Sequence, residues 1–393
     1  MTIPRFSQKT LKEQLIERSM KLGFGALHIT SLDTLPDFAP RLNQWLELKY
    51  HGSMNYMQEH SQVRASPHVL WPEAKSALLF AFPYKPDNQP PSNISPEYHG
   101  KIASYAQRRD YHDIVKGKLK ELGAFLVRQT NADIKVFVDT GPLMEKPLAE
   151  HAGLGWQGKH TVLVSRQLGN WFSLGAILTT LKLPADKPET NHCGTCHKCL
   201  KACPTQAFPA PFQLDARRCI AYYTVEHKGL APRSLRPLFG NRIFGCDDCL
   251  AACPWNKFAR DCQEIRFSVR PELINPPLTD LLQLDDASFR ALFAATPVKR
   301  IGRDRFLRNV LVACGNTHNS DLLKLLVPLL NDHSSLVRAM AVWAIHEICP
   351  EEIKKRMPNH FPQEQNTLVQ EEWLATRKTI KRSIVSEYQI SSS

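Results

Sequence analysis

Four cysteines crowd into a short stretch near the middle of the 393-residue chain. They are Cys193, Cys196, Cys199 and Cys203, and Pro204 directly follows the last of them. The spacing, with two, two and three residues between successive cysteines, matches the run with which bacterial ferredoxins bind four-iron clusters. In that run three cysteines bind one cluster and the fourth binds a second, so more ligands are required elsewhere in the chain.

The missing ligands lie downstream. Cys219 is followed by the segment GCDDCLAACP, which contributes Cys246, Cys249 and Cys253. We interpret Cys219 as the displaced first cysteine of this second set, separated from the others by an insertion of residues 220–245. The predicted ligands of two 4Fe–4S clusters are Cys193, Cys196, Cys199 and Cys253 for one cluster, and Cys203, Cys219, Cys246 and Cys249 for the other.

Zinc and disulfides explain the pattern less well. Structural zinc takes four ligands, usually as two separated pairs, which leaves the triple repeat and both Cys-Pro dipeptides without a role. The first 25 residues form an amphipathic pattern and do not resemble a secretory signal. We therefore expect a cytoplasmic protein with reduced thiols. No apolar run approaches the ~18 residues that a membrane span needs.

Three regions of different character follow one another along the chain. Strand-like and helical stretches alternate up to residue 185, which predicts an α/β domain. Residues 186–265 hold too few apolar side chains for a core of their own, so we expect a ferredoxin-like domain that its clusters hold together. Residues 276–385 are helical, and two amphipathic segments, 303–316 and 334–348, resemble a short HEAT-like repeat. Of the leftover cysteines, Cys314 and Cys349 are expected to be buried apolar residues in these helices.

The net charge indicates the kind of partner, and the absence of nucleotide-binding motifs limits the kind of cofactor. A formal net charge of +12 favours a polyanionic partner such as nucleic acid. No GxGxxG fingerprint follows a predicted strand, and no P-loop is present. The clusters must therefore pass electrons to a cofactor that leaves no such motif, or to the substrate itself.

Four stretches together resemble the epoxyqueuosine reductase family, which is related to the corrinoid reductive dehalogenases. The segment from 138 to 161 reads VDTGPLMEKPLAEHAGLGWQGKHT, and it is the combination of the stretches that is specific. The other stretches are RRDYH (108–112), the cysteine-rich segments 193–208 and 214–229, and GNRIFGCDDCLAACPWNKF (240–258).

The resemblance implies cofactors, a substrate and a reaction. Base-off cobalamin would lie in the α/β domain, and an external donor would send electrons through the two clusters to cobalt. The enzyme would open the epoxide of epoxyqueuosine, the modified wobble base in the anticodon stem-loop of tRNA. Loss of water would leave the alkene of queuosine, in the last step of queuosine synthesis. The resemblance also suggests a monomer, and the lack of a long apolar run predicts no membrane partner.

The resemblance assigns the proton donor to Asp139. Its position after a strand and before Gly141-Pro142 suits that role, although a turn residue is the simpler reading of a lone aspartate. In a dry pocket against an apolar cofactor, we expect its pKa to be raised. The residues predicted to contact the cofactor are Arg64, Asp139, Trp156, Lys159, His160, Thr161, Tyr223 and Thr224.

Some of these residues have a plain structural alternative. Arg64 and Lys159 could be solvated surface charges, and Tyr223 and Thr224 could be core residues. His160 stands where the family usually has asparagine. An imidazole near cobalt could bind it, or could simply line the pocket with a polar group.

Basic residues beside the cluster region could contact the RNA backbone. The predicted RNA-binding residues are Arg217, Lys228, Arg242 and Arg303, with a further basic run at 377–382. A solvated basic surface is the alternative. For the whole chain, the rival functions are a ferredoxin-type electron carrier without cobalamin, a small-molecule reductase of the dehalogenase kind, and a zinc-based RNA-binding module.

Overall fold

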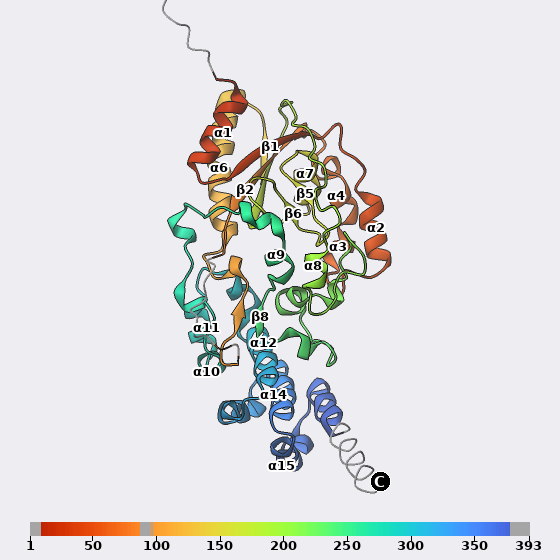
Figure 1. Ribbon diagram of the computed structural model, residues 1–393, viewed down its shortest axis with the longest axis vertical. Helices are drawn as coiled ribbons and strands as arrows, with labels where there is room; N and C mark the ends of the chain where they lie inside the picture. Colours follow the sequence, from red (N-terminus) through yellow and green to blue (C-terminus); the bar gives the residue numbers. More distant parts are fainter. Residues whose placement is uncertain (1–8, 87–94, 96, 378–393) are drawn as a thin grey trace, which may run out of the picture. The chain divides into compact units, whose positions relative to one another are not determined.

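The protein forms two compact units, each assembled from three separate segments of the chain (Figure 1). The computed structural model describes residues 9–86, 95 and 97–377. The first unit contains the described parts of 1–86, 108–216 and 247–268, and the second those of 87–107, 217–246 and 269–393. The three consecutive domains predicted above, 1–185, 186–265 and 276–385, divide the chain by sequence character, whereas the two units are interleaved along it.

The first unit is built on a four-stranded sheet. Its strand order is β1-β2-β7-β4, and every neighbouring pair is antiparallel. The central strand β2 is buried along its whole length, because helices cover both faces of the sheet. The strands are β1 (Ala26–Ser31), β2 (Ser76–Pro83), β7 (Phe172–Thr179) and β4 (Ile134–Phe137). The predicted alternation of strands and helices is present, and β1 is a strand that the sequence analysis missed.

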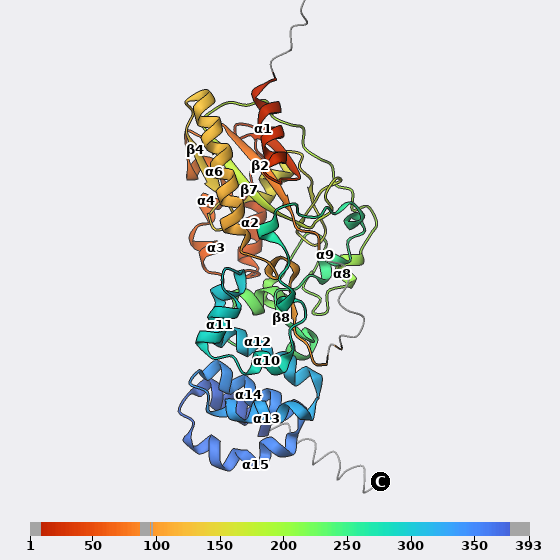
Figure 2. The same cartoon turned by 90° about the vertical axis from the view of Figure 1, so that its left-hand side faces the viewer.

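Two helices cover one face of the sheet and a third covers the other. Figure 2 shows α6 (Tyr111–Thr130) lying along β4 and β7, with α1 (Leu11–Lys21) beside it. On the opposite face, α7 (Glu145–His151) joins the apolar core that includes alternate residues of β2 and β7. Successive residues of a strand point to opposite faces, so β2 and β7 contribute side chains to the packing on both faces of the sheet.

Helix α6 packs very closely on the sheet. A Cβ atom at Gly123 would lie 2.2 Å from Cδ1 of Ile134, and one at Gly175 would lie 2.7 Å from Cδ1 of Leu119. Only glycine allows this approach at the two positions. The packing holds the N-terminus of α6 in a fixed relation to β4, the strand that Asp139 follows.

The cysteine-rich segments of the first unit contain little regular structure, as predicted. Two one-turn helices, α8 (Lys198–Lys201) and α9 (Asp248–Ala251), begin beside the closely spaced cysteines and pack on each other. A short antiparallel hairpin of β5 (Trp156–Gln157) and β6 (Leu163–Val164) carries the glycine-rich ribbon of residues 153–161. The remaining short helices of this unit are α2 (Ala39–Glu47), α3 (Tyr56–Glu59), α4 (Ser61–Ala65) and α5 (Pro67–Leu70).

The second unit is mainly helical. Its longest helices, α12 (Gly302–Thr317) and α14 (Ser335–Ile348), pack on each other and match the two predicted amphipathic segments within two residues (Figure 2). The stretch between these two helices is broken into short turns around α13 (Leu323–Leu326), because Pro328 cannot donate a helical hydrogen bond. The other elements are β3 (Lys101–Ile102) paired in parallel with β8 (Arg242–Phe244), and α10 (Leu278–Leu282), α11 (Asp286–Leu292) and α15 (Pro350–His360).

No helix in the described part of the chain is both long enough and apolar enough to cross a membrane.

The packing of α6 leads to a stability prediction. Leu119 is fully buried between α6 and β7. We expect Leu119→Ala to lower the free energy of unfolding by about 2–5 kcal/mol, because it leaves a cavity under the helix. The neighbouring exposed Lys120→Ala should change it by less than about 0.5 kcal/mol. Urea denaturation followed by circular dichroism measures both, and equal effects would contradict the packing described here.

Candidate active site and cluster centre

The first predicted cluster has its four cysteines together within the first unit. Burial raises the pKa of Cys253 to about 11, and the charges of Cys193, Cys196 and Cys199 add to the rise. All four are free thiols. Thiols that interact electrostatically in this way suit a metal cluster, since metal binding removes their protons and offsets the repulsion between the thiolates. The residues present therefore fit a 4Fe–4S cluster.

Two side chains from the glycine-rich ribbon hold the loop of this cluster. Trp156 is fully buried, and its Nε1–H donates to Sγ of Cys193 at 3.4 Å. Lys159 is also buried, and its Nζ donates to the carbonyl oxygens of Gly194 (2.7 Å) and Cys196 (2.9 Å). Both residues were predicted to contact cobalamin, and Lys159 is no solvated lysine. A fixed ammonium here also favours the negative charge of cluster thiolates.

The second cluster's ligands are distributed over both units. Cys203 and Cys249 belong to the first unit, and Cys219 and Cys246 belong to the second. Sγ of Cys203 accepts a hydrogen bond from the backbone N–H of Ala207 at 3.2 Å, an interaction that cluster thiolates commonly make. This ligand set stays a prediction from spacing.

The leftover helical cysteines differ from each other. Cys314 is fully buried inside α12, as predicted. Cys349 is only partly buried, so that prediction was wrong for Cys349. Its backbone is extended between α14 and α15, because the following Pro350 excludes a helical conformation at the residue before it.

Asp139 lies just beyond β4, and three groups fix its position. Its backbone has φ +56°, a left-handed conformation that aspartate tolerates better than most residues. The backbone N–H donates to Oε1 of Glu145 at 2.9 Å. The hydroxyl of Tyr111 donates to Oδ2 at 2.7 Å, and Nε2 of His112 lies 3.5 Å from the same oxygen. The Asp139 side chain is nevertheless 67% exposed, so it faces open space from a rigid base.

The two carboxyl groups of this loop have opposite pKa shifts. Hydrogen bonds from His112 and then Tyr111 hold the pKa of Asp139 below its usual range, although the protein around the exposed carboxyl group displaces some of its water and opposes them. The raised pKa expected for Asp139 is therefore not found in the protein alone. Burial raises the pKa of Glu145 to about 7, and the charge of Asp139 adds to the rise. Near neutral pH, Glu145 rather than Asp139 is the carboxyl group that holds a proton for part of the time.

His160 has protein partners at both ring nitrogens. Nδ1 accepts from the backbone N–H of Val162 at 3.1 Å, and Nε2 lies 3.3 Å from Nδ2 of Asn170. Burial lowers the pKa of His160 to about 4, and the positive charge of Lys146 adds to the fall. A neutral imidazole whose Nδ1 accepts a hydrogen bond carries its single proton on Nε2, so neither ring nitrogen offers a free lone pair. This favours the role of pocket lining over that of a cobalt ligand. The next residue, Thr161, has φ +65°, and its carbonyl oxygen accepts from Nζ of Lys146 at 3.3 Å.

Arg64 fits a cofactor contact. It lies in α4, with its guanidinium 5.6 Å from the centre of the Tyr56 ring. Its Nε is buried and has no hydrogen-bond partner among the described residues. An unpaired buried donor is costly, and an amide or phosphate oxygen of a bound cofactor would satisfy it.

Tyr223 and Thr224 are buried in the second unit, where a π-helical turn (Tyr222–Glu226) carries them. The hydroxyl of Tyr223 donates to the carbonyl oxygen of Arg217 at 2.7 Å, and Oγ1 of Thr224 accepts from the backbone N–H of Gly245 at 2.9 Å. These contacts support the core-packing alternative. A π-turn is nonetheless rare and often marks a functional site, so a cofactor contact stays a prediction.

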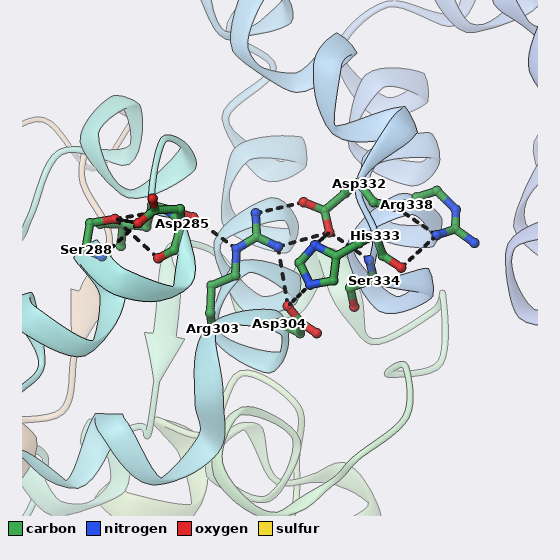
Figure 3. Close-up of polar contacts among 9 residues, drawn as sticks. Asp285, Ser288, Arg303, Asp304, Asp332, His333, Ser334 and Arg338 are labelled. Carbon is green, nitrogen blue, oxygen red and sulfur yellow. Dashed lines mark hydrogen bonds and ion pairs between the residues drawn. The ribbon is translucent and has the colours of Figure 1, made fainter.

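The four predicted RNA-binding residues fall into two groups. Arg217 and Lys228 are exposed. Arg303 is buried and pairs with both carboxylate oxygens of Asp332, at 2.7 and 2.9 Å, as Figure 3 shows. Arg242 donates to the carbonyl oxygen of Phe239 at 3.0 Å. Structural roles are therefore favoured for the second pair. Of the basic run 377–382, only its first residue is among those described.

Sequence reasoning missed three residues of the site, namely Tyr111, His112 and Glu145. The first two belong to the RRDYH stretch, which was quoted for the resemblance without a role. The signal was a histidine two residues after the aspartate that begins a helix, and only the packing of α6 on β4 brings it to Asp139.

Comparison with known proteins identifies the family. Residues 64–140 match the family described as "Epoxyqueuosine reductase QueG, DUF1730", and residues 192–256 match the 4Fe-4S double cluster binding domain. The curated epoxyqueuosine reductase of Escherichia coli is 39% identical over 338 residues, which cover 85% of this chain and 89% of that protein. That of Xanthomonas campestris is 42% identical over 327 residues, which cover 82% and 92%. The chain belongs to the epoxyqueuosine reductase family.

Solved structures of the family agree with this fold. A crystal structure of epoxyqueuosine reductase with a modified tRNA stem loop matches with a TM-score of 0.87 and 29% identity, covering 94% of this chain and 99% of that one. A Bacillus subtilis epoxyqueuosine reductase, with its catalytic aspartate loop swung out of the active site, matches with a TM-score of 0.85 and 30% identity, covering 93% and 98%.

Membership in the epoxyqueuosine reductase family confirms several predictions. The chain is an oxidoreductase of this family, and its cofactors are two 4Fe–4S clusters and cobalamin. A ferredoxin-type carrier is not favoured, because the similarity extends far beyond the cluster domain. The roles of individual residues stay predictions.

The contacts of Lys159 lead to a prediction about cluster stability. We expect Lys159→Met to release iron from one cluster about tenfold faster, because a hydrogen bond from a charged donor contributes about 1.5–3 kcal/mol. Anaerobic transfer of iron to a chelator measures the rate, and the second cluster is the internal reference. The exposed Lys182→Met is the control. Unchanged release would show that Lys159 does not stabilise the loop.

The raised pKa of Glu145 leads to a prediction about pH. The pKa is about 7 in the folded chain against 4.5 for an ordinary glutamate, so the unfolded chain loses this proton first as pH rises. Between pH ~4.5 and 7, the free energy of unfolding of the wild type should fall by up to about 3 kcal/mol because of this group. Glu145→Gln should not show this fall. Urea denaturation of both at pH 5 and 8 measures the difference, with the exposed Glu73→Gln as control. A pH-independent difference would contradict the shift.

Proposed function

We propose that this chain reduces epoxyqueuosine at the wobble position of tRNA to queuosine, as a cytoplasmic monomer supplied with electrons by an external donor. The observation that carries the proposal is the Asp139 loop. An exposed carboxyl group is held rigidly beside two hydrogen-bond donors, in a chain with the fold and cluster domain of this family. The cytoplasm is where a tRNA substrate would be met.

The cysteines would divide between the clusters as their spacing indicates. Mutual electrostatic interaction of Cys193, Cys196, Cys199 and Cys253 supports the first ligand set. For the second cluster we propose Cys203, Cys219, Cys246 and Cys249. Electrons would enter through one cluster and leave through the other to the cofactor.

Cobalamin, when bound, supplies the metal centre that delivers the electrons to the substrate. The unpaired buried Nε of Arg64 and the ribbon 153–161 are the features that support a site for it. The residues that would hold it are Arg64, Trp156, Lys159, His160, Thr161, Tyr223 and Thr224. Of these, Trp156 and Lys159 would act by fixing the nearby cluster loop.

Asp139 would protonate the departing epoxide oxygen. Its carboxyl group is 67% exposed, so a substrate can reach it, while Glu145 holds its backbone N–H. A bound cofactor and base would exclude water and shift the pKa of Asp139 upward from its present low value, which makes the carboxyl group a better proton donor.

The RNA would be held largely by charge. The exposed Arg217 and Lys228 are the predicted residues best able to reach phosphates, and the net charge of +12 favours the encounter. The modified base must leave its stack to reach the reacting centre, as in other enzymes that act on a base. The proposal includes α12 and α14, which would act as a HEAT-like repeat that helps to hold the phosphate backbone.

A single-turnover experiment with Asp139→Asn tests the proposal. Chains purified without oxygen and loaded with cobalamin should hold about eight irons and one cobalt. The wild type should reduce an epoxyqueuosine stem-loop, and Asp139→Asn should do so about 10²–10⁴-fold more slowly with the same metal content. Asp133→Asn, an exposed aspartate just before β4, is the matched control.

Two results would contradict the proposal. A wild-type rate for Asp139→Asn would end its role as the acid. A wild type that holds eight irons but no cobalt would leave an electron carrier as the better function.

A further inference from the structure

The proposed reaction needs two protons, and Asp139 carries one. Both carbon–oxygen bonds of the epoxide break, a carbon–carbon double bond forms, and the oxygen leaves as water. Two electrons come from the external donor through the clusters, so two protons are needed for the balance. We propose that His112, oriented by Asp110, is the positioning residue that returns a proton to Asp139 and so supplies the second one. This inference rests on the proposed function, both for the two-proton reaction and for the role of Asp139 as the acid.

Asp110 fixes the ring of His112. Its Oδ1 accepts from the backbone N–H of His112 at 3.0 Å, which caps α6, and from Nδ1 of the same residue at 2.7 Å. With Nδ1–H directed at Asp110, the other ring nitrogen faces Oδ2 of Asp139 at 3.5 Å. The three side chains thus form a continuous line from carboxylate to imidazole to carboxylate.

The line runs from the interior to the open side of the loop. The side chains of Asp110 and His112 are only 8% and 12% exposed, whereas that of Asp139 is 67% exposed. A proton held by His112 is therefore shielded from bulk water, and it can leave by transfer to Asp139. The close packing of α6 on β4 holds His112 and Asp139 in place relative to each other.

The charges around His112 favour its cationic form. A neutral imidazole has one N–H, so only the imidazolium can donate to both carboxylates that flank it. Asp110 and Asp139 face the ring, and Glu145 and Lys146 act on Asp139 from the start of α7. The positive end of α6 opposes a cation, and the buried Asp110 carboxylate offsets that effect.

Tyr111 is a weaker candidate for the second proton. Its hydroxyl donates to the same oxygen of Asp139 at 2.7 Å, and its ring stacks on His112 with centres 4.1 Å apart. A phenol ordinarily has a pKa of about 10 against about 6.5 for imidazole, so imidazole gives up its proton more readily near neutral pH. Tyr111 is better placed to hold Asp139 and His112 in position.

The first test is His112→Gln, because Gln can donate a hydrogen bond to Asp139 but cannot give up a proton. In single-turnover reduction of an epoxyqueuosine stem-loop, we expect a rate about 10²-fold below wild type with unchanged KM, iron and cobalt. The wild-type rate should fall as pH rises from 6 to 8, while the variant's rate stays flat. Lys116→Gln, exposed on the same helix, is the control. A wild-type rate and pH profile for His112→Gln would overturn the inference.

The second test does not depend on activity. Nitrogen NMR of ¹⁵N-histidine in the full chain with oxidised clusters and no cobalamin, assigned by difference with His112→Gln, reports the protonation of the ring. We expect both nitrogens of His112 to be protonated at pH 7, and the second proton to be lost at a lower pH in Asp139→Asn. A ring with one proton at pH 6–8, unaffected by Asp139→Asn, would overturn the inference even if His112→Gln were slow.

The two proposals can fail separately. If the wild type binds its cofactors but does not reduce the stem-loop, the proposed function fails, and the NMR result alone decides the state of His112. If the wild type is active and Asp139→Asn is slow while His112 holds one proton, only the inference about His112 fails.

Discussion

The electrostatic interaction among four neighbouring cysteines is the constraint on which the first unit depends. Burial and mutual repulsion make such a set unfavourable as thiolates, which is why the pKa of Cys253 is raised to about 11 without metal. A cluster reverses this balance by binding the thiolates, so folding of the loops and cluster assembly must be coupled. The protein prepares the site by holding the backbone of the first loop through Trp156 and Lys159.

That preparation links the first cluster loop to the loop of Asp139 through the short ribbon of residues 153–161. Residues 156–161 begin at the cluster with Trp156 and Lys159 and end at Thr161, whose carbonyl oxygen accepts from Lys146. Lys146 in turn acts electrostatically on Asp139 and Glu145. The same short ribbon therefore contacts both the first cluster loop and Lys146, which acts on Asp139. The ribbon can serve both centres because it is a hairpin fixed between β5 and β6 rather than a free loop.

Local sequence patterns were enough to predict some elements of the fold and some residues of the site, but not the contacts between distant segments. The cysteine spacing, the end of β4 at Asp139 and helices α12 and α14 depend on neighbours in sequence, and the analysis found them. Strand β1 was missed because its six residues, ALHITS, show no clean alternation. The burial of Lys159, the pairing of Arg303 with Asp332, and the contact of His112 with Asp139 depend on segments 27 to 37 residues apart. No periodicity encodes such contacts, so only the packed fold reveals them.

The arginines show how a charge count can mislead about recognition. Arg236 pairs with Glu372, Arg338 with Glu364, and Arg303 with Asp332. Ion pairing leaves the net charge of +12 unchanged, but a buried, paired guanidinium cannot reach a phosphate without abandoning its carboxylate, which costs several kcal/mol. These residues stabilise the second unit whether or not RNA is present. The proposed affinity for tRNA would then come from cations that lie at the surface, and its dependence on salt should reflect their smaller number rather than the total.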